Sequence, residues 1–221
     1  MAKIHKNHKW TEERSIRFVE KSKNYLNSRY KPFAKEIVSF MKKYNIKNNP
    51  KLLEIGCGPG LLLFEIKKIA PYLTLIGIDP SDYMLEAARE NAKEYQITDF
   101  ELKQGYAEKI LIPNDDIKVV ICLNSLHDFK DAKKVLQESY RVLHNSGILI
   151  LNDKNGSYPK WKVILGFIPY IFKMGCKRTR MYLKTSKIWF DPAEVSNWLS
   201  KIGFKIKKIE KKLDYLIVAQ K

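Results

Sequence analysis

The sequence predicts an α/β protein with a mostly parallel β-sheet covered by helices on both faces, and three observations lead to that prediction. From Lys51 onward, short apolar segments typical of buried strands alternate with segments of helical spacing. A glycine-rich turn at residues 54–60 follows the first of these strands. A helix and two closely spaced strands complete the pattern between residues 191 and 219. Because 45% of the 221 residues are hydrophobic, residues 1–221 can bury one full core, and we expect a single domain.

Two helices are expected before the sheet, within residues 1–48. The first nine residues are polar and basic, so we expect a frayed end there. Thr11 is suited to cap a helix that runs to about Ser28. A second helix is expected from near Pro32, a residue that a first helical turn tolerates. Apolar residues from Phe33 to Tyr44 recur there at helical spacing.

The alternating region predicts five strands with helices between them. Each strand candidate is short and apolar, and turn residues or a helical segment follow it. The expected strands cover residues 52–55, 73–78, 100–103, 117–123 and 148–151, and the expected helices cover residues 61–69, 81–95 and 131–143.

The C-terminal segment carries clear boundary signals. Asp191 is a good N-cap, Pro192 suits the first helical position, and Glu194 can complete a capping box. Gly203 is the expected stop of that helix. Residues 204–209 and 215–219 then predict two strands that are close enough to pair as a hairpin.

The glycine-rich turn is the sharpest functional signal, with the sequence Glu-Ile-Gly-Cys-Gly-Pro-Gly between a strand and a helix. Glycines let the backbone approach a ligand closely, and the helix N-terminus behind them offers unpaired N–H groups. At the carboxyl end of a central parallel strand, such a loop predicts nucleotide binding. A dinucleotide fingerprint needs glycine at position 61, where Leu61 stands, and no G-K-[ST] follows as in a P-loop. A nicotinamide oxidoreductase is therefore disfavoured.

Asp79 ends the second strand, about twenty residues after the glycine loop. A carboxylate in that place is positioned to accept two hydrogen bonds from a ribose diol. The alternative is an ordinary helix cap before Pro80 and Ser81. The combination with the glycine loop favours ribose binding.

From these residues onward, the chain resembles the class I S-adenosylmethionine-dependent methyltransferases, particularly the broad group that acts on small molecules. Residues 54–60 look like motif I of that family, and residues 79–85 are similar to its acidic loop. The resemblance continues through residues 124–129 and covers roughly residues 33–153 and 189–221. It implies a Rossmann-like, doubly wound sheet of seven strands with the last strand antiparallel. Motif I and the acidic loop are specific for the cofactor class, whereas neither is specific for the methyl acceptor.

The resemblance also implies roles for single residues in binding S-adenosylmethionine, whose product is S-adenosylhomocysteine. It places Gly56 and Gly58 against the methionine part, with Glu54 supporting the loop, and Met84 against the adenine, unless Met84 only packs in its helix. The family often has Gly-Asp-Ala after the third strand, where this chain has Gly105-Tyr106-Ala107, which weakens the adenine assignment. The predicted cofactor-binding residues are Glu54, Gly56, Cys57, Gly58, Gly60, Asp79, Pro80, Met84, Gly105, Tyr106, Ala107 and Asn124.

His127 is the candidate catalytic residue. The sulfonium cofactor carries an activated methyl group, so the protein supplies mainly binding, in-line alignment and exclusion of water. A general base is needed only for an acceptor that arrives protonated, and His127 follows the fourth strand on the expected acceptor side. The alternative is a histidine that only shapes the pocket wall. Adjacent side chains often point apart, so Asp128 is not predicted to orient His127.

Residues 154–190 form an expected insertion after the fifth strand. They hold nine Lys and Arg residues, no Asp or Glu, and several aromatic residues. The first interpretation is a lid or acceptor pocket for a small molecule. A membrane surface, single-stranded RNA and plain helical packing are the alternatives. An RNA or protein methyltransferase, or a cofactor-binding module without catalysis, therefore stays open beside the small-molecule enzyme.

Charge and cysteine usage limit the partners and the cellular compartment that can be expected. The net charge of +17 fits either an anionic partner or a composition rich in lysine, isoleucine and asparagine. Three widely separated cysteines (Cys57, Cys122 and Cys176) predict a reducing, cytoplasmic setting. No CxxC pair or HExxH motif suggests a metal. No apolar run reaches the roughly 20 residues of a membrane span, and the basic N-terminus lacks the apolar stretch of a secretory signal.

Overall fold

The computed structural model of the chain describes residues 11–47, 49–162, 165 and 188–221. Most of the expected insertion at residues 154–190 therefore lies outside the described residues. The same is true of the frayed end expected at residues 1–9 and of Cys176.

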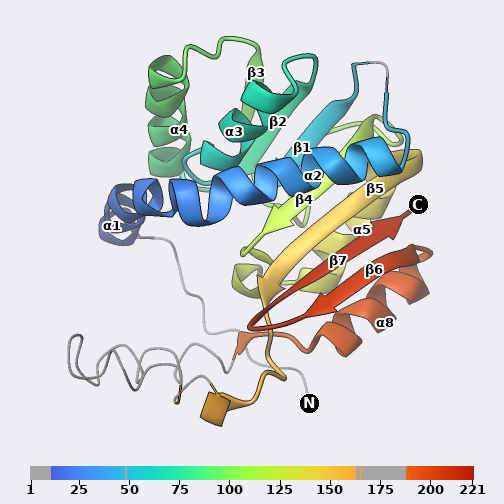
Figure 1. Cartoon of the computed structure of the whole chain (residues 1–221). Helices are drawn as coiled ribbons and strands as arrows, with labels where there is room; N and C mark the ends of the chain where they lie inside the picture. The colour runs from blue at the N-terminus through green and yellow to red at the C-terminus, as the bar shows by residue number, and fades with distance from the viewer. Residues whose placement is uncertain (1–10, 48, 163–164, 166–187) are drawn as a thin grey trace.

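The described chain folds into alternating strands and helices that follow the predicted order (Figure 1). The strands are β1 (Lys51–Ile55), β2 (Thr74–Asp79), β3 (Phe100–Gln104), β4 (Ile117–Leu123), β5 (Leu143–Lys154), β6 (Lys205–Lys211) and β7 (Asp214–Gln220). The α-helices are α1 (Glu12–Ser22), α2 (Lys31–Lys43), α3 (Leu61–Ile69), α4 (Asp82–Glu94), α5 (Ala132–Val142) and α8 (Pro192–Ile202). Short turns of other helix types are η1 (Lys23–Tyr25), η2 (Leu26–Tyr30) and η3 (Leu126–Asp128).

Two elements differ from the prediction in extent. The first helix was expected to reach about Ser28, but α1 ends at Ser22 and continues as a 3₁₀ turn and a π-turn. Asn24, Asn27 and Ser28 favour this change, because their side chains compete for the backbone hydrogen bonds of a helix. The fifth strand was expected at residues 148–151, but β5 is longer at both ends and runs from Leu143 to Lys154.

The strands form one seven-stranded sheet in the order β3-β2-β1-β4-β5-β7-β6. All neighbouring pairs are parallel except those of β7, which runs antiparallel to β5 and β6. The predicted Rossmann-like, doubly wound architecture with an antiparallel last strand is therefore confirmed. Chain order reverses between β1 and β4, where Ile55 lies level with Cys122 and, on the other side, with Ile78 of β2. Ligands of such folds bind at the carboxyl ends of the strands beside this reversal.

Helices cover both faces of the sheet (Figure 1). On one face, α2 and α3 pack against residues such as Leu52, Leu75 and Ile121, all with no measurable exposure. On the other face, α5 and α8 cover the residues that alternate with them, such as Leu53 and Val120. Strands buried on both faces are continuously apolar, which is why β1 and β4 were predicted well.

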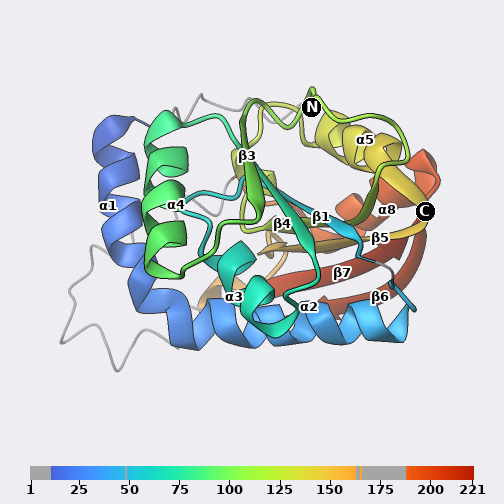
Figure 2. The same cartoon turned by 90° about the horizontal axis from the view of Figure 1, so that it is seen from above.

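The first helix lies at the carboxyl edge of the sheet rather than over a face. Figures 1 and 2 both show α1 beside α4. This position brings α1 close to the loops that follow β1 and β2.

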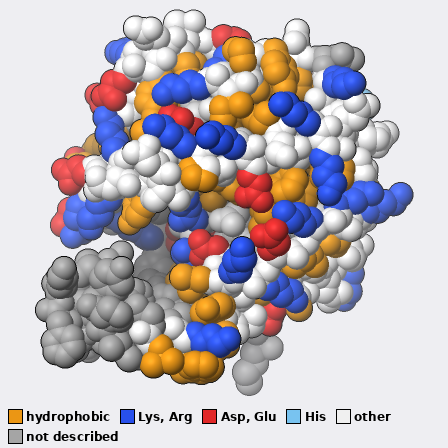
Figure 3. All heavy atoms as spheres, in the orientation of Figure 1, with side chains coloured by type: hydrophobic (Ala, Val, Ile, Leu, Met, Phe, Trp, Pro, Cys, Tyr) orange, Lys and Arg blue, Asp and Glu red, His pale blue; other side chains and the backbone are white. Residues whose placement is uncertain are grey.

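The surface carries its positive charge in a dispersed form on the face that Figure 3 shows, where Lys and Arg side chains alternate with acidic ones. Among the described helices, none has both the length and the apolar character that crossing a bilayer requires.

Candidate active site

The glycine loop between β1 and α3 has a backbone that only glycine adopts readily. Gly56, Gly58 and Gly60 have φ angles of +68°, +52° and +72°. The backbone N–H groups of Gly56 and Cys57 both donate to the carbonyl oxygen of Ile78, at 2.8 and 3.1 Å. These bonds hold the loop against the end of β2, next to Asp79.

The three glycines differ in the space around them. A Cβ added at Gly56 would lie 2.8 Å from Ser125 Oγ, and one added at Gly60 would lie 2.8 Å from the Phe64 ring. At Gly58 the nearest atoms would be Phe18 Cε1 at 3.7 Å and Met84 Sδ at 3.9 Å. Gly56 and Gly60 are therefore required by close packing, whereas a Cβ at Gly58 would make only ordinary van der Waals contacts.

Asp79 connects the glycine loop to the start of α4. Its Oδ2 accepts a hydrogen bond from the Gly58 backbone N–H at 3.0 Å, and its Oδ1 accepts one from the Ser81 N–H at 2.9 Å. Burial raises the pKa of this carboxyl group, while the two backbone bonds act in the opposite direction. The cap alternative is thus partly realised, and each oxygen keeps a lone pair for a ligand hydroxyl.

Glu54 and Asn124 leave polar atoms unsatisfied beside this loop. Glu54 Oε2 and Asn124 Oδ1 are buried and have no hydrogen-bond partner among the described residues. Burial raises the pKa of Glu54 well above its usual value, and the charge of Asp79 adds to that effect. A buried polar group without a partner costs about 1–3 kcal/mol, so both atoms fit a ligand that supplies N–H or O–H donors. S-adenosylmethionine offers such donors on its ammonium group and ribose, so the residues present fit this cofactor.

The remaining predicted cofactor residues lie around the same loops with different exposure. Met84 is 2% exposed, and Ala107 is buried as well. Cys57 is buried, and its Sγ lies 2.8 Å from where a Cβ on Gly77 would be, so Cys57 fits only beside a glycine. Pro80 and Gly105 are half-buried, and Tyr106 is 71% exposed.

His127 lies on η3, directly after β4, and its partner is an aspartate that sequence reasoning missed. The ring Nδ1 is 2.6 Å from Asp153 Oδ1, and the His127 backbone N–H donates to Asp153 Oδ2 at 3.0 Å. Asp128 Oδ2 is 3.9 Å from the other ring nitrogen, Nε2, which is beyond hydrogen-bond distance. Burial lowers the pKa of His127, but the charge and hydrogen bond of Asp153 and the charge of Asp128 outweigh it, so the pKa is raised.

The sequence contains a pattern that could have placed Asp153 in the fifth strand. Leu149, Leu151 and Asp153 alternate along β5 and belong to the same face of the sheet. Since the strand was predicted to end at Leu151, Asp153 lay between that strand and the insertion expected from residue 154, and it was not placed beside His127.

The first helix contributes a second group of residues that the sequence did not reveal. Phe18 borders Gly58, and Ser15 Oγ lies 3.4 Å from Ser81 Oγ in the acidic loop. Arg14 forms an ion pair with Asp128 at 3.8 Å. Through these contacts α1 covers the loops that follow β1, β2 and β4.

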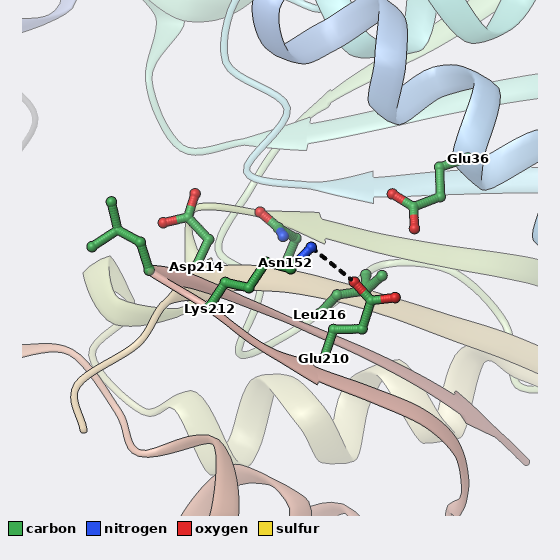
Figure 4. A pocket seen from close by; sticks show the side chains of 7 residues that line it. Glu36, Asn152, Glu210, Lys212, Asp214 and Leu216 are labelled. Carbon is green, nitrogen blue, oxygen red and sulfur yellow. Dashed lines mark ion pairs between the residues drawn. The ribbon is translucent and has the colours of Figure 1, made fainter. Parts of the chain in front are cut away.

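A separate cleft of about 240 Å³ lies between α2 and the β6–β7 hairpin (Figure 4). It is lined by Glu36, Asn152, Glu210, Lys212, Leu213, Asp214 and Leu216. None of these is a predicted cofactor residue, although the Asn152 carbonyl accepts the backbone N–H of Asn124 at 2.7 Å. The cleft therefore adjoins the loop after β4 on the α2 face of the sheet, whereas Asp153 lies on the other face. In the described ranges, no three His, Cys, Asp or Glu side chains gather as metal ligands would.

Comparison with known proteins gives a consistent result. A family model described as a methyltransferase domain matches residues 46–216. The chain is 31% identical to a ubiquinone biosynthesis O-methyltransferase of Histophilus somni, over 72% of this chain and 66% of that protein. It is 29% identical to a demethylmenaquinone methyltransferase of Listeria welshimeri, over 56% of this chain and 53% of that protein. The matches thus span between about half and two thirds of the length of these relatives.

Solved structures share the fold at lower identity. An S-adenosylmethionine-dependent methyltransferase from Aquifex aeolicus superposes with a TM-score of 0.63. The superposition covers 82% of this chain and 87% of that one, at 17% identity. This likeness concerns the fold alone.

Proposed function

Since this chain belongs to the methyltransferase-domain family of class I S-adenosylmethionine-dependent enzymes, we propose that it transfers a methyl group to a small-molecule acceptor by direct in-line displacement. The observation that carries the proposal is the pair of unsatisfied buried oxygens, Glu54 Oε2 and Asn124 Oδ1, beside a glycine loop bonded to Asp79. A bound ligand with several donors would satisfy both atoms.

The chain's own residues would divide the binding of the cofactor between them. Asp79 would accept the ribose hydroxyls, and Gly58 would let the methionine part approach the backbone. Glu54 Oε2 and Asn124 Oδ1 would accept donors at the methionine end. The buried Met84 would contact the adenine. When bound, S-adenosylmethionine supplies a methyl group on a sulfonium sulfur, which leaves with the electron pair of the broken bond.

His127 would take the proton of the acceptor. Its Nδ1 faces Asp153, so Nε2 is the ring nitrogen left to accept a proton. A positioned base of this kind contributes roughly 10²–10⁴-fold to a rate. An acceptor with an ionisable hydroxyl group therefore suits the site better than one that arrives as a free amine.

The names of the relatives narrow the acceptor class within this proposal. One acts in ubiquinone biosynthesis as an O-methyltransferase, and another is a demethylmenaquinone methyltransferase. We therefore place a hydroxyl-bearing aromatic small molecule first among candidate acceptors.

The test is transfer of labelled methyl from S-adenosylmethionine to three probes of different chemistry: catechol, histamine and bulk tRNA. The proposal predicts label in catechol with one equivalent of S-adenosylhomocysteine formed. Label in tRNA alone would establish the nucleic-acid alternative instead. Cofactor binding without transfer to any small phenol or amine would favour a non-catalytic module.

A further inference from the structure

We propose that Asp153 is the positioning residue that makes His127 a base, by holding its ring in one orientation and one tautomer. This inference rests on the proposed function, because it assigns a role within the same site. It concerns a residue pair whose members lie on different elements, Asp153 near the end of β5 and His127 on η3.

Asp153 contacts both the backbone and the ring of His127. Asp153 binds the His127 backbone N–H through Oδ2 and the ring Nδ1 through Oδ1, at 3.0 and 2.6 Å. The backbone bond alone would fix the loop after β4. The ring contact adds a fixed direction for the imidazole, which a loop tether does not require.

The carboxylate is itself held rigidly. Asp153 is 1% exposed, and its Oδ1 also accepts the Lys154 backbone N–H at 2.6 Å. The backbone N–H groups of His127 and Lys154 both donate to this carboxylate. A carboxylate oxygen accepts hydrogen bonds, so the Asp153 contact selects the tautomer with the proton on Nδ1, and the neutral ring carries its lone pair on Nε2.

Titratable and charged groups face the pair from several neighbouring elements. His127 faces Asp153 and Lys154 of β5 and Asp128 of η3. Asp153 also acts on Cys122 of β4 and Tyr215 of β7, both buried and both with a raised pKa caused first by burial. Asp128 is paired with Arg14 of α1, at 3.8 Å. Asp153 is therefore the acidic group in hydrogen-bond contact with the ring, and Asp128 is a more distant charge.

The consequence is a proton path of one step. The acceptor's hydroxyl proton moves to His127 Nε2, and the oxygen keeps the electron pair that forms the new O–CH₃ bond. The resulting imidazolium is stabilised by the adjacent Asp153 carboxylate and later releases its proton to solvent. This is the arrangement in which an aspartate selects the tautomer of a catalytic histidine.

The first experiment needs no acceptor. The full chain is labelled with ¹⁵N-histidine, and long-range ¹H–¹⁵N spectra are recorded across a pH titration, with His127→Gln used to assign the signal. We expect neutral His127 to carry its proton on Nδ1 and to titrate above the usual histidine range. Asp153→Asn should lower the titration midpoint. Asp116→Asn, the same change at the opposite end of β4, should not. A neutral wild-type ring protonated on Nε2, or an unchanged titration in Asp153→Asn, would overturn the proposal.

The second experiment uses turnover of catechol. Asp153→Asn should lower kcat by roughly 10²-fold or more, and Asp153→Glu should restore part of it. In the His127→Gln background, Asp153→Asn should cause no further loss of kcat. A further loss of similar size there would show that Asp153 does not act through His127.

Calorimetry separates this inference from the proposed function. Each variant should bind S-adenosylmethionine like the wild type, because neither residue is assigned to the cofactor. Failure of the wild type to bind S-adenosylmethionine would contradict the proposed function, whatever the histidine spectra show. Normal binding, together with a His127 titration that Asp153→Asn leaves unchanged, would contradict only the inference about Asp153.

Discussion

Asp79 is the residue at which local structure and predicted function are most closely joined. Its two carboxylate oxygens fix the Gly58 and Ser81 backbone, and we propose that the same oxygens accept the ribose hydroxyls. Removing this side chain should therefore affect both the loop and the ligand.

We expect Asp79→Ala to weaken S-adenosylmethionine binding by about 1–3 kcal/mol, or roughly 5–150-fold in Kd, because a charged hydrogen-bond partner is lost. Isothermal calorimetry measures this directly. Asp82→Ala, an exposed acidic position three residues later, is the matched control and should bind normally. Equal affinities for Asp79→Ala and the wild type would remove Asp79 from the ribose.

Glu54 should oppose folding while it serves binding. Its pKa is raised by burial and by Asp79, so the folded chain holds this proton more tightly than the unfolded chain does. The stability of the unliganded protein is therefore expected to fall as pH rises above the ordinary carboxyl range, near 4.3.

We expect Glu54→Gln to raise the Tm of the unliganded protein, with a gain that is larger at pH 8 than at pH 5, and to weaken cofactor binding. A gain of about 1 kcal/mol corresponds to roughly 2–4 °C for a chain of this size. Thermal melts at the two pH values test the sign. Glu86→Gln, an exposed position on α4, should show no such trend. A gain that shrinks with rising pH would contradict the assignment of a strained, buried carboxylate.

At the scale of elements, the glycine loop has to pack closely against its neighbours and, as we propose, to bind the cofactor. Mutations at different glycines can separate these two requirements. Gly60 is closely packed against Phe64 and Ala88, at 2.8 and 3.2 Å from an added Cβ. Gly58 has looser surroundings, and we propose that its backbone faces the cofactor.

We expect Gly58→Val to abolish S-adenosylmethionine binding while the far-ultraviolet circular dichroism spectrum stays native. Its φ of +52° adds strain of about 1–2 kcal/mol, which a folded domain tolerates. Gly60→Ala should instead destabilise the fold itself, by roughly 1–3 kcal/mol of overpacking and strain. Chemical denaturation and calorimetry on both variants distinguish the two effects. Retained binding in Gly58→Val would mean that the loop does not face the cofactor.

Element identity was predictable from the sequence because periodicity and caps are local. The apolar β1 and β4, the capped α8 and the closing hairpin all follow from residues within each element. Element extent was less predictable, as the early end of α1 and the longer β5 show. The position of α1 over the glycine loop depends on contacts such as Ser15 with Ser81, which join distant segments and leave no periodic signal.

The same distinction holds within the candidate site. Glu54, the glycines and Asp79 form a contiguous pattern around one sheet edge, so the sequence placed them together. Asp153 meets His127 only because β4 and β5 are adjacent and parallel. Asp128, next in sequence to His127, pairs with Arg14 of α1, so sequence neighbours were a poor guide to contact.

At the scale of the whole molecule, the sheet order determines where chemistry is possible. Placing β1 between β2 and β4 brings the glycine loop, Asp79 and Asn124 to one edge, and β5 beside β4 adds Asp153. The helices on both faces serve the core and leave this edge to loops and α1. On the face shown in Figure 3, the Lys and Arg side chains of the described residues lie among acidic ones.

The most direct test of the central claim is calorimetric titration of the purified chain with S-adenosylmethionine and S-adenosylhomocysteine, with NAD as the control. We predict micromolar binding of both sulfur nucleotides with one site per chain, and no heat of binding with NAD. That result would establish the cofactor site around Asp79 and direct further work to the acceptor. Binding of NAD, or of neither sulfur nucleotide, would contradict the cofactor assignment on which the proposed function depends.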